Sequence, residues 1–562
     1  MAADGVVRVD DYHDGTKHFF HRFAPASGYL DWASQPRPFR SFEGAPTVSL
    51  YPRPDAPGAL VEWAHPTYDQ LFHPQVLAQP LDRVPVTAGT IGHFLRYALG
   101  LSAWKAIGKS RWSLRVNPSS GNLHPTEAYL VTGALAGLGD APGVWHYAPD
   151  RHVLEQRAVL PASAWQVLGA GEPGESFLVA LTSIHWRESW KYGERAFRYC
   201  QHDIGHAIAA LSLSAAVCGW RMTMLPTWPH RAVATLGGLD RDDDYFERER
   251  EEPAGVFLVS ADHQMPGPSS AAGPFLDCVR QGIWHGRASQ LSEAHVVWRF
   301  IDAVARATED PGRAVEPPPA RSVSPVEAPD RALAAETVLL QRRSAVAFDG
   351  SSVLRREPFV RMLLRTLPGS GAPWNALWWS PRIHLVLFVH RVEGVMPGLY
   401  LLMRDEAAAP RVKLALSPAF AWETQADLAP LRLLRAGDVR LRARQLSCDQ
   451  DIAADGFFSL AMIAEFGASL EEQGPSFYRQ LFWEAGVIGQ VLYLEAEAAG
   501  ARGTGIGCFY DDPVHELLGL HGHAFQSLYH FTVGMPVEDR RLTTEPGYTW
   551  EHPTPSQTTV VS

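Results

Sequence analysis

Residues 203–220, DIGHAIAALSLSAAVCGW, are small or apolar on nearly every side of a predicted helix. A helix that is apolar all round has to be buried at the centre of a protein. Residues 484–501, EAGVIGQVLYLEAEAAGA, have the same character at an offset of 281 residues (203 to 484), and a glycine near each carboxyl end is a typical helix stop. The sequence therefore predicts two central, buried helices.

The similarity between the two halves extends beyond these helices. Residues 198–239 align with residues 479–520 without a gap, and the identities far exceed the roughly one in fifteen expected by chance. The two halves are therefore predicted to be related domains. The identical pairs are Arg198/Arg479, Gly205/Gly486, Leu211/Leu492, Leu213/Leu494, Ala215/Ala496, Gly219/Gly500, Arg221/Arg502, Thr223/Thr504, Val233/Val514, Leu236/Leu517, Gly238/Gly519 and Leu239/Leu520.

Strand-like segments flank both helices. Hydrophobic strand candidates, EAYLVTG (127–133) and RIHLVLFVH (382–390), precede them. After each helix come a Gly/Thr-rich turn, a charged segment and a second β-rich piece, AGVFLVS (254–260) or SLYHFTVG (527–534). This order predicts an α+β fold, with helices packed around a small sheet in each half.

Chain length predicts two domains joined by connecting segments, because 562 residues exceed what one hydrophobic core usually serves. The first 75 residues have no counterpart in the second half and are predicted to be an extension or lid, whereas the Pro-rich stretch 311–330 is typical of an extended linker. We expect an extension at 1–75, domain 1 at 76–265, a connecting helix and linker at 266–330, domain 2 at 331–546 and a tail at 547–562.

Charge and cysteine content narrow the environment and the partners. A formal net charge of -11 argues against a general nucleic-acid or membrane partner and favours a small molecule or another protein. Five widely spaced cysteines without a CxxC pair favour reduced thiols. The amino terminus lacks a secretory pattern, and the longest apolar run, 207–220, is shorter than the ~20 residues of a spanning helix. We expect a soluble, cytoplasmic protein.

Three motifs carry a family resemblance. NPSSGNLHP (117–125) resembles the Pro-Ser-Ser-x-Asn loop of the nitroreductase superfamily, and LLQRRSAVAFDG (339–350) resembles its Arg-x-Ser entry helix. Together with SWKYGERAFRYCQHDIGH (189–206), the set is more narrowly similar to the SagB-type thiazole/oxazole dehydrogenase branch. The resemblance implies two tandem nitroreductase-like domains and flavin-dependent oxidation of azolines in a modified peptide or small molecule.

Members of this family are usually homodimers that bind FMN at the subunit interface, each site drawing on both subunits. Here the two sets of motifs are divided between the halves, which implies an intrachain pseudo-dimer, possible as a monomer, with one working flavin site. The second copy of the loop, GAPWNALWWSP (371–381), lacks paired serines, so a degenerate site filled by tryptophans is expected. Val346 stands where the family often has lysine or arginine. The resemblance assigns cofactor contacts to Pro118, Ser119, Ser120, Asn122, Arg342, Ser344, Ile506, Gly507 and, loosely, Arg541.

Lys191 and Tyr192 are the candidate catalytic residues. Removing hydrogen from a substrate requires a base for the proton while flavin N5 accepts hydride. Burial would have to lower the pKa of the lysine, or a cation such as Arg195 that of the tyrosine. The alternative interpretation is an amphipathic helix that forms salt bridges.

A zinc site is the rival interpretation of His202 and His206, which have i,i+4 spacing. Asp203 stands where zinc hydrolases need glutamate, and the second copy of the helix has no histidine pair, so no metal is expected. The predicted function is an FMN-dependent dehydrogenase or oxidase. An NAD(P)H-dependent nitro or quinone reductase and a flavin-free binding subunit remain as alternatives.

Overall fold

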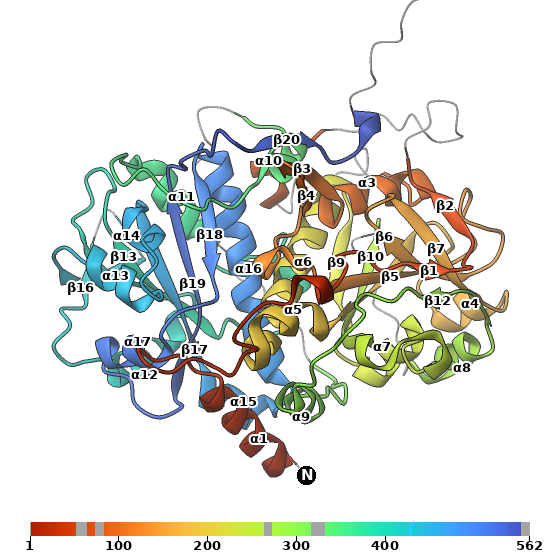
Figure 1. Cartoon of the computed structure of the whole chain (residues 1–562), viewed down its shortest axis with the longest axis horizontal. Coiled ribbons are helices and arrows are strands. Elements are labelled where there is room, and N and C mark those ends of the chain that lie inside the picture. The colour runs from red at the N-terminus through yellow and green to blue at the C-terminus, as the bar shows by residue number, and fades with distance from the viewer. Residues whose placement is uncertain are drawn as a thin grey trace, which may run out of the picture.

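The computed structural model describes residues 2–51, 65–72, 84–262, 272–315, 332–425, 428 and 430–551. Within these ranges each half of the chain forms a large antiparallel sheet, and two long helices pack against each other between the halves (Figure 1). Most of the predicted linker at 311–330 and the end of the predicted tail lie outside the described residues. In the described part of the chain, the helices lack the length and apolar character that crossing a membrane requires.

Six strands of each large sheet follow the same order, from β7 to β9 in the first and from β16 to β18 in the second, whereas the outer edge strands, β11 and β15, come from different places in the chain. The first runs β11-β7-β6-β5-β8-β10-β9, with β2 also pairing with β7, and the second runs β15-β16-β14-β13-β17-β19-β18. The first contains β2 (Thr47–Ser49), β5 (Thr126–Thr132), β6 (Gly143–Ala148), β7 (Val153–Val159), β8 (Ser176–Ser183), β9 (Arg221–Met224), β10 (Glu252–Ser260) and β11 (Ile283–Trp284). The second contains β13 (Ile383–Val389), β14 (Gly398–Leu402), β15 (Glu423–Thr424), β16 (Leu431–Ala436), β17 (Phe458–Glu465), β18 (Arg502–Ile506) and β19 (Phe525–Gly534).

These sheets confirm the predicted mixture of helix and sheet. The four predicted strands correspond to β5, β13, β10 and β19. The Gly/Thr-rich segments after the helices are instead edge strands, β9 and β18, which pair with β10 and β19. The prediction of a turn was wrong there because cross-strand pairing supplies partners that local sequence does not reveal.

The central helices are α6 (Ala196–Val217) and α16 (Phe477–Ala498), and every residue of α6 is buried. They cross with their backbones in contact at Gly205 and Gly486. A Cβ atom on Gly205 would lie 2.2 Å from the carbonyl oxygen of Trp483, and one on Gly486 would lie 2.3 Å from that of His202. Glycine at both matched positions is therefore what permits the close crossing.

Segments at both ends of the chain tie the halves together. Helix α1 (Ala2–Gly15) packs on α9 (Arg299–Ala307), and His13 lies 3.2 Å from the Tyr478 hydroxyl. Near the carboxyl end, β20 (Thr543–Pro546) pairs with β3 (Leu101–Ile107), which in turn pairs with β4 (Ser110–Arg115) (Figure 1). A strand at the carboxyl end of the second half thus completes a sheet with strands of the first half.

The remaining elements surround these layers. Strands β1 (Phe42–Glu43) and β12 (Arg287–Ala288) form a small separate pair. The other α-helices are α3 (Ala88–Ala98), α4 (Ala164–Leu168), α5 (His185–Tyr192), α7 (His230–Gly237), α8 (Gly273–Arg280), α10 (Ala335–Gln341), α11 (Arg356–Arg365), α12 (Ala409–Ala415), α13 (Arg440–Leu446), α14 (Ile452–Asp455), α15 (Phe466–Gln473) and α17 (Asp511–Leu518).

Candidate functional site

A cavity of about 550 Å³ lies where the two halves meet. Its wall includes the loop between β4 and β5, part of α6, the segment after α10, and β18 with the turn that follows. Residues 536–539 and Leu542 complete this side of the cavity. This volume is within the range of small-molecule and cofactor sites. Of the residues predicted from the sequence, the cavity is lined by Pro118, Ser119, Ser120, Asn122, Tyr192, Arg342, Ser344, Ile506 and Gly507, whereas Lys191 and Arg541 are not in the lining.

The loop at residues 117–125, called the serine loop below, is held in place by a polar network that includes the buried Asp203. The Ser119 hydroxyl accepts a hydrogen bond from the His124 amide at 2.7 Å, and the backbone amide and hydroxyl of Ser120 each lie 3.1 Å from Asp203 Oδ1 on α6. The Asn122 side chain donates to the Ser113 carbonyl at 2.9 Å. These bonds fix the loop against α6 and leave its backbone on the cavity wall.

Positive charge gathers in the cavity. Five lining residues are lysine or arginine and three are aspartate or glutamate. Arg342 is buried and donates to the carbonyls of Arg115 and Val116 at 2.9 and 3.1 Å, but it forms no ion pair with a described residue and its Nε has no hydrogen-bond partner among them. Burial lowers the pKa of Arg342, which indicates a guanidinium short of negative charge. An arrangement of this kind favours an anionic ligand.

Three further cationic side chains line the same cavity as Arg342 and add positive charge to it. Arg343 donates only to backbone carbonyls among the described residues, and burial lowers its pKa to about 10. Lys105 and Arg502 also line the cavity, and Arg502 lies 3.3 Å from Glu497. Arg343, Lys105 and Arg502 were not predicted from the sequence as site residues. Arg343 is adjacent to the Arg-x-Ser motif and was the one that local sequence could have suggested.

Arg541 does not line the cavity, where the family resemblance loosely placed it as a cofactor contact. Its guanidinium forms an ion pair with Asp539 at 2.7 Å, and its side chain is 78% exposed. In the local sequence DRR, Asp539 stands two residues before Arg541, so its carboxylate can pair with the Arg541 guanidinium. This expectation is therefore corrected, and Arg343, Arg502 and Lys105 supply the further positive charge.

Tyr192 lies at the cavity beside the serine loop. A Cβ atom on Gly121, whose φ is +59°, would lie 2.5 Å from the Tyr192 hydroxyl, so the loop approaches this phenol closely. Burial raises the pKa of Tyr192 well above its ordinary value, and Glu188 and Tyr199 raise it further. That direction is opposite to the lowering that a tyrosine base would need at neutral pH. Lys191 Nζ lies 5.1 Å from the centre of the Tyr192 ring.

Asp203 is the acidic group that the sequence analysis did not select. It is buried on the cavity wall, and burial raises its pKa to about 7, against the lowering effect of hydrogen bonds from Ser119 and Ser120. A carboxylate with this pKa can hold or release a proton at neutral pH. His202 and His206, the neighbours once weighed as zinc ligands, both contact Tyr529, at 4.1 Å between ring centres and 3.2 Å to the hydroxyl, respectively.

Asp203→Asn is expected to remove a pH-dependent loss of stability. Because the pKa of Asp203 is higher in the folded state, its protonated carboxyl group stabilises the folded state. This stabilisation is fully present below pH 3.8 and is lost as pH rises through about 7. At 1.36 kcal/mol per pKa unit, the loss is at most about 4 kcal/mol. The variant should gain in free energy of unfolding relative to the wild type between pH 5 and pH 8 in urea titrations. Asp539→Asn, at a carboxylate whose pKa is lowered to about 2, should show a flat difference over this range.

A second cavity, of about 350 Å³, is also lined by residues of both halves. The offset of 281 places Glu484 opposite Asp203 and Arg221 opposite Arg502, and both line this cavity. Glu484 pairs with the buried Arg404 and accepts a hydrogen bond from the Trp379 indole at 3.1 Å. The tryptophans expected to fill a degenerate site thus line a smaller, less polar cavity, formed by Trp374, Trp378 and Trp379 with Pro226, Pro368 and Pro381.

Comparison with known proteins shows which family model and which solved structures this chain resembles. Residues 79–246 match the model of the Nitroreductase family. A protein assigned as a nitroreductase in Methanocaldococcus jannaschii is 24% identical over 141 residues, which are 24% of this chain and 66% of that relative. A crystal structure of a protein assigned as a nitroreductase from Anabaena variabilis is 21% identical, covers 94% of this chain and 99% of its own, and has a TM-score of 0.67. The chain therefore shares the overall fold of that crystal structure, and residues 79–246 match the family model.

The NADPH:FMN oxidoreductase of Vibrio harveyi is also similar, at 16% identity, over 36% of this chain and 71% of its own, with a TM-score of 0.21. Nitroreductase family members use FMN, which agrees with the expected cofactor. The family match supports an oxidoreductase of the flavin type.

Proposed function

We propose that the chain is an FMN-dependent oxidoreductase of the dehydrogenase type, with its two halves arranged as an intrachain pseudo-dimer. The observation that carries this proposal is Arg342, a buried guanidinium on the cavity wall without a carboxylate partner among the described residues. A phosphate dianion is the ligand that such a group lacks, because charge-assisted hydrogen bonds replace the water it has lost. Arg343, Arg502 and Lys105 add charge at the same cavity.

The residues present fit FMN at both ends. Arg342 and Ser344 would hold the phosphate, and Pro118, Ser119, Ser120 and Asn122 would face the isoalloxazine together with Ile506 and Gly507. A side chain at position 507 would clash, since its Cβ atom would lie 2.4 Å from the Tyr199 ring, so glycine leaves space on this wall. Bound FMN supplies an acceptor for hydride.

The chain's own residues would handle the proton. Tyr192, protonated at neutral pH, is a hydrogen-bond donor to substrate, and Lys191 lies beside its ring. Asp203, with a pKa of about 7, is the lining carboxyl group able to accept a proton. This division favours removal of a hydride and a proton from one substrate, as in oxidation of an azoline in a modified peptide or a small molecule.

Flavin content tests the proposal directly. Protein purified and reconstituted with FMN should hold about one FMN per chain, measured from the visible spectrum after release by denaturation. Two per chain would contradict the assignment of the tryptophan-lined cavity as degenerate. None would remove the enzyme assignment and favour a binding subunit, and rapid anaerobic bleaching by NAD(P)H would favour a nitro or quinone reductase.

A further inference from the structure

Two cysteines from distant parts of the sequence meet at the edge of the main cavity. Cys508 follows Gly507 in the turn after β18 and lines the cavity, and Cys448 lies in the turn after α13. Their Sγ atoms are 2.8 Å apart, and both residues are half-buried. His18 Nδ1 lies 3.6 Å from Cys508 Sγ. Among the described residues, His18, Cys448 and Cys508 form the group of three potential metal-ligating side chains whose ligand atoms all lie within 4.8 Å of one another.

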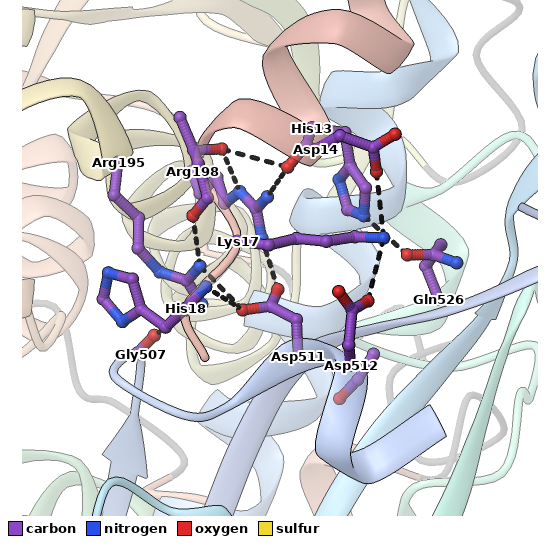
Figure 2. A network of polar contacts seen from close by, with 12 residues as sticks. His13, Asp14, Lys17, His18, Arg195, Arg198, Gly507, Asp511, Asp512 and Gln526 are labelled. Atoms are coloured by element: carbon purple, nitrogen blue, oxygen red, sulfur yellow. Dashed lines mark hydrogen bonds and ion pairs between the residues drawn. The ribbon is translucent and has the colours of Figure 1, made fainter. Parts of the chain in front are cut away.

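The guanidinium of Arg195 acts on Cys508. Asp511 binds both Arg195 and Arg198, at 2.9 and 2.8 Å, so one carboxylate serves two guanidinium groups. Arg195 also donates to the carbonyl of Gly507 at 3.2 Å, next to Cys508. Figure 2 shows His18, Arg195 and Asp511 converging on this turn. A guanidinium beside sulfur favours the thiolate form of the cysteine.

The two sulfurs differ in protonation. The hydrogen bond with Cys448, followed by His18 and Arg195, lowers the pKa of Cys508 to about 5. The same hydrogen bond, with burial, raises the pKa of Cys448 above its ordinary value. At neutral pH the pair is therefore one thiolate, at Cys508, and one thiol, at Cys448. This is the starting state for thiol–disulfide exchange.

We propose that Cys448 and Cys508 form a redox-active pair that closes to a disulfide on reaction with a low-molecular-weight disulfide. The Cys508 thiolate attacks one sulfur of the external disulfide, which forms a mixed disulfide, breaks the external S–S bond and releases one thiolate. Cys448 then attacks Cys508 Sγ, gives its proton to the departing group and releases the second thiol. The protein loses two electrons, and the external disulfide is reduced to two thiols.

The consequence for the main cavity is local. A Cys448–Cys508 bond joins the turn after β18, which carries Ile506 and Gly507, to the turn after α13. The disulfide would therefore restrain this part of the cavity wall, and its reduction to two thiols would remove the restraint. The exchange reaction itself does not depend on the proposed flavin function.

The test uses the full-length protein, with and without added FMN, equilibrated in buffers of graded ratios of reduced to oxidised glutathione. After acid quenching, free thiols are blocked with N-ethylmaleimide, and the digest is analysed by mass spectrometry. We expect a linked peptide pair containing Cys448 and Cys508, whose thiols disappear together in one two-electron transition. Cys278 is half-buried and serves as the internal comparison.

Two variants resolve the roles of the sulfurs. In Cys448→Ser, Cys508 should stop at the glutathione mixed disulfide, and in Cys508→Ser, Cys448 should react at least about tenfold more slowly than Cys508 does in the first variant. Cys278→Ser should leave the linkage unchanged.

Either of two results overturns the proposal, and the wild-type titration yields them even when a variant fails to fold. One is the independent accumulation of glutathione on Cys448 and Cys508 without a linked peptide. The other is a stoichiometric zinc ion, detected by elemental analysis, that shields both thiols from N-ethylmaleimide, because it would make the cluster a metal site. Flavin content is measured on the same sample, so failure of the two proposals is distinguishable.

Discussion

Arg342→Ala is expected to raise the dissociation constant for FMN roughly 10- to 100-fold. The variant removes a buried guanidinium that lacks a carboxylate among the described residues, so its charge-assisted hydrogen bonds are available to the phosphate. Hydrogen bonds to charged groups contribute about 1.5–3 kcal/mol, and about 1.4 kcal/mol corresponds to a tenfold change in affinity. Quenching of flavin fluorescence during titration with the flavin-free protein measures the effect.

Arg541→Ala is the matched control for this experiment. It removes the same side chain from a surface site where Asp539 is its partner, so the FMN affinity should stay within about twofold of the wild type, as is usual for exposed ion pairs. Equal losses in both variants would show that general surface charge, and not the Arg342 site, governs binding. Circular dichroism of each variant checks that the fold is retained.

Gly205→Ala is expected to reduce the free energy of unfolding by about 3 kcal/mol, the upper end of the usual overpacking cost. The added Cβ atom would lie 2.2 Å from the backbone oxygen of Trp483 and 2.8 Å from the Cα atom of Gly486. Both neighbours are backbone atoms of a buried helix, so the clash can be relieved only by moving α16. Urea denaturation followed by circular dichroism measures the loss.

Gly139→Ala provides the comparison, because a Cβ atom there has no heavy atom within 4 Å among the described residues. Its unfolding midpoint should match that of the wild type. A Gly205→Ala variant with an unchanged midpoint would mean that the two central helices do not need this close contact.

The sequence predicted the parts of the fold that repeat. Two central, buried helices with matched glycines at 205 and 486 were predicted, but their crossing at these two residues was not, because the backbone contact becomes visible only in the folded chain. Strands with continuous apolar runs, such as β13, were also predicted from the sequence. Strand β20 was not, since its pairing with β3 joins residues more than 400 positions apart and its burial pattern is fully exposed.

The candidate site divides in the same way. Arg342 and the serine loop were selected from short motifs, and the cavity brings them together. The raised pKa of Asp203 could not be predicted, because it depends on burial by residues from several segments. The Cys448–Cys508 pair also escaped prediction, since sixty residues separate cysteines that the spacing suggested were unrelated.

The presence of both long helices in one chain has a consequence for how the two cavities change over evolutionary time. In an assembly of two identical subunits, any substitution alters both symmetry-related sites at once, so a site cannot be lost without losing its twin. Here Asp203 and Glu484 are encoded separately, and each lines its own cavity. A substitution at Asp203 therefore leaves the lining of the second cavity unchanged, and one at Glu484 leaves the lining of the first unchanged.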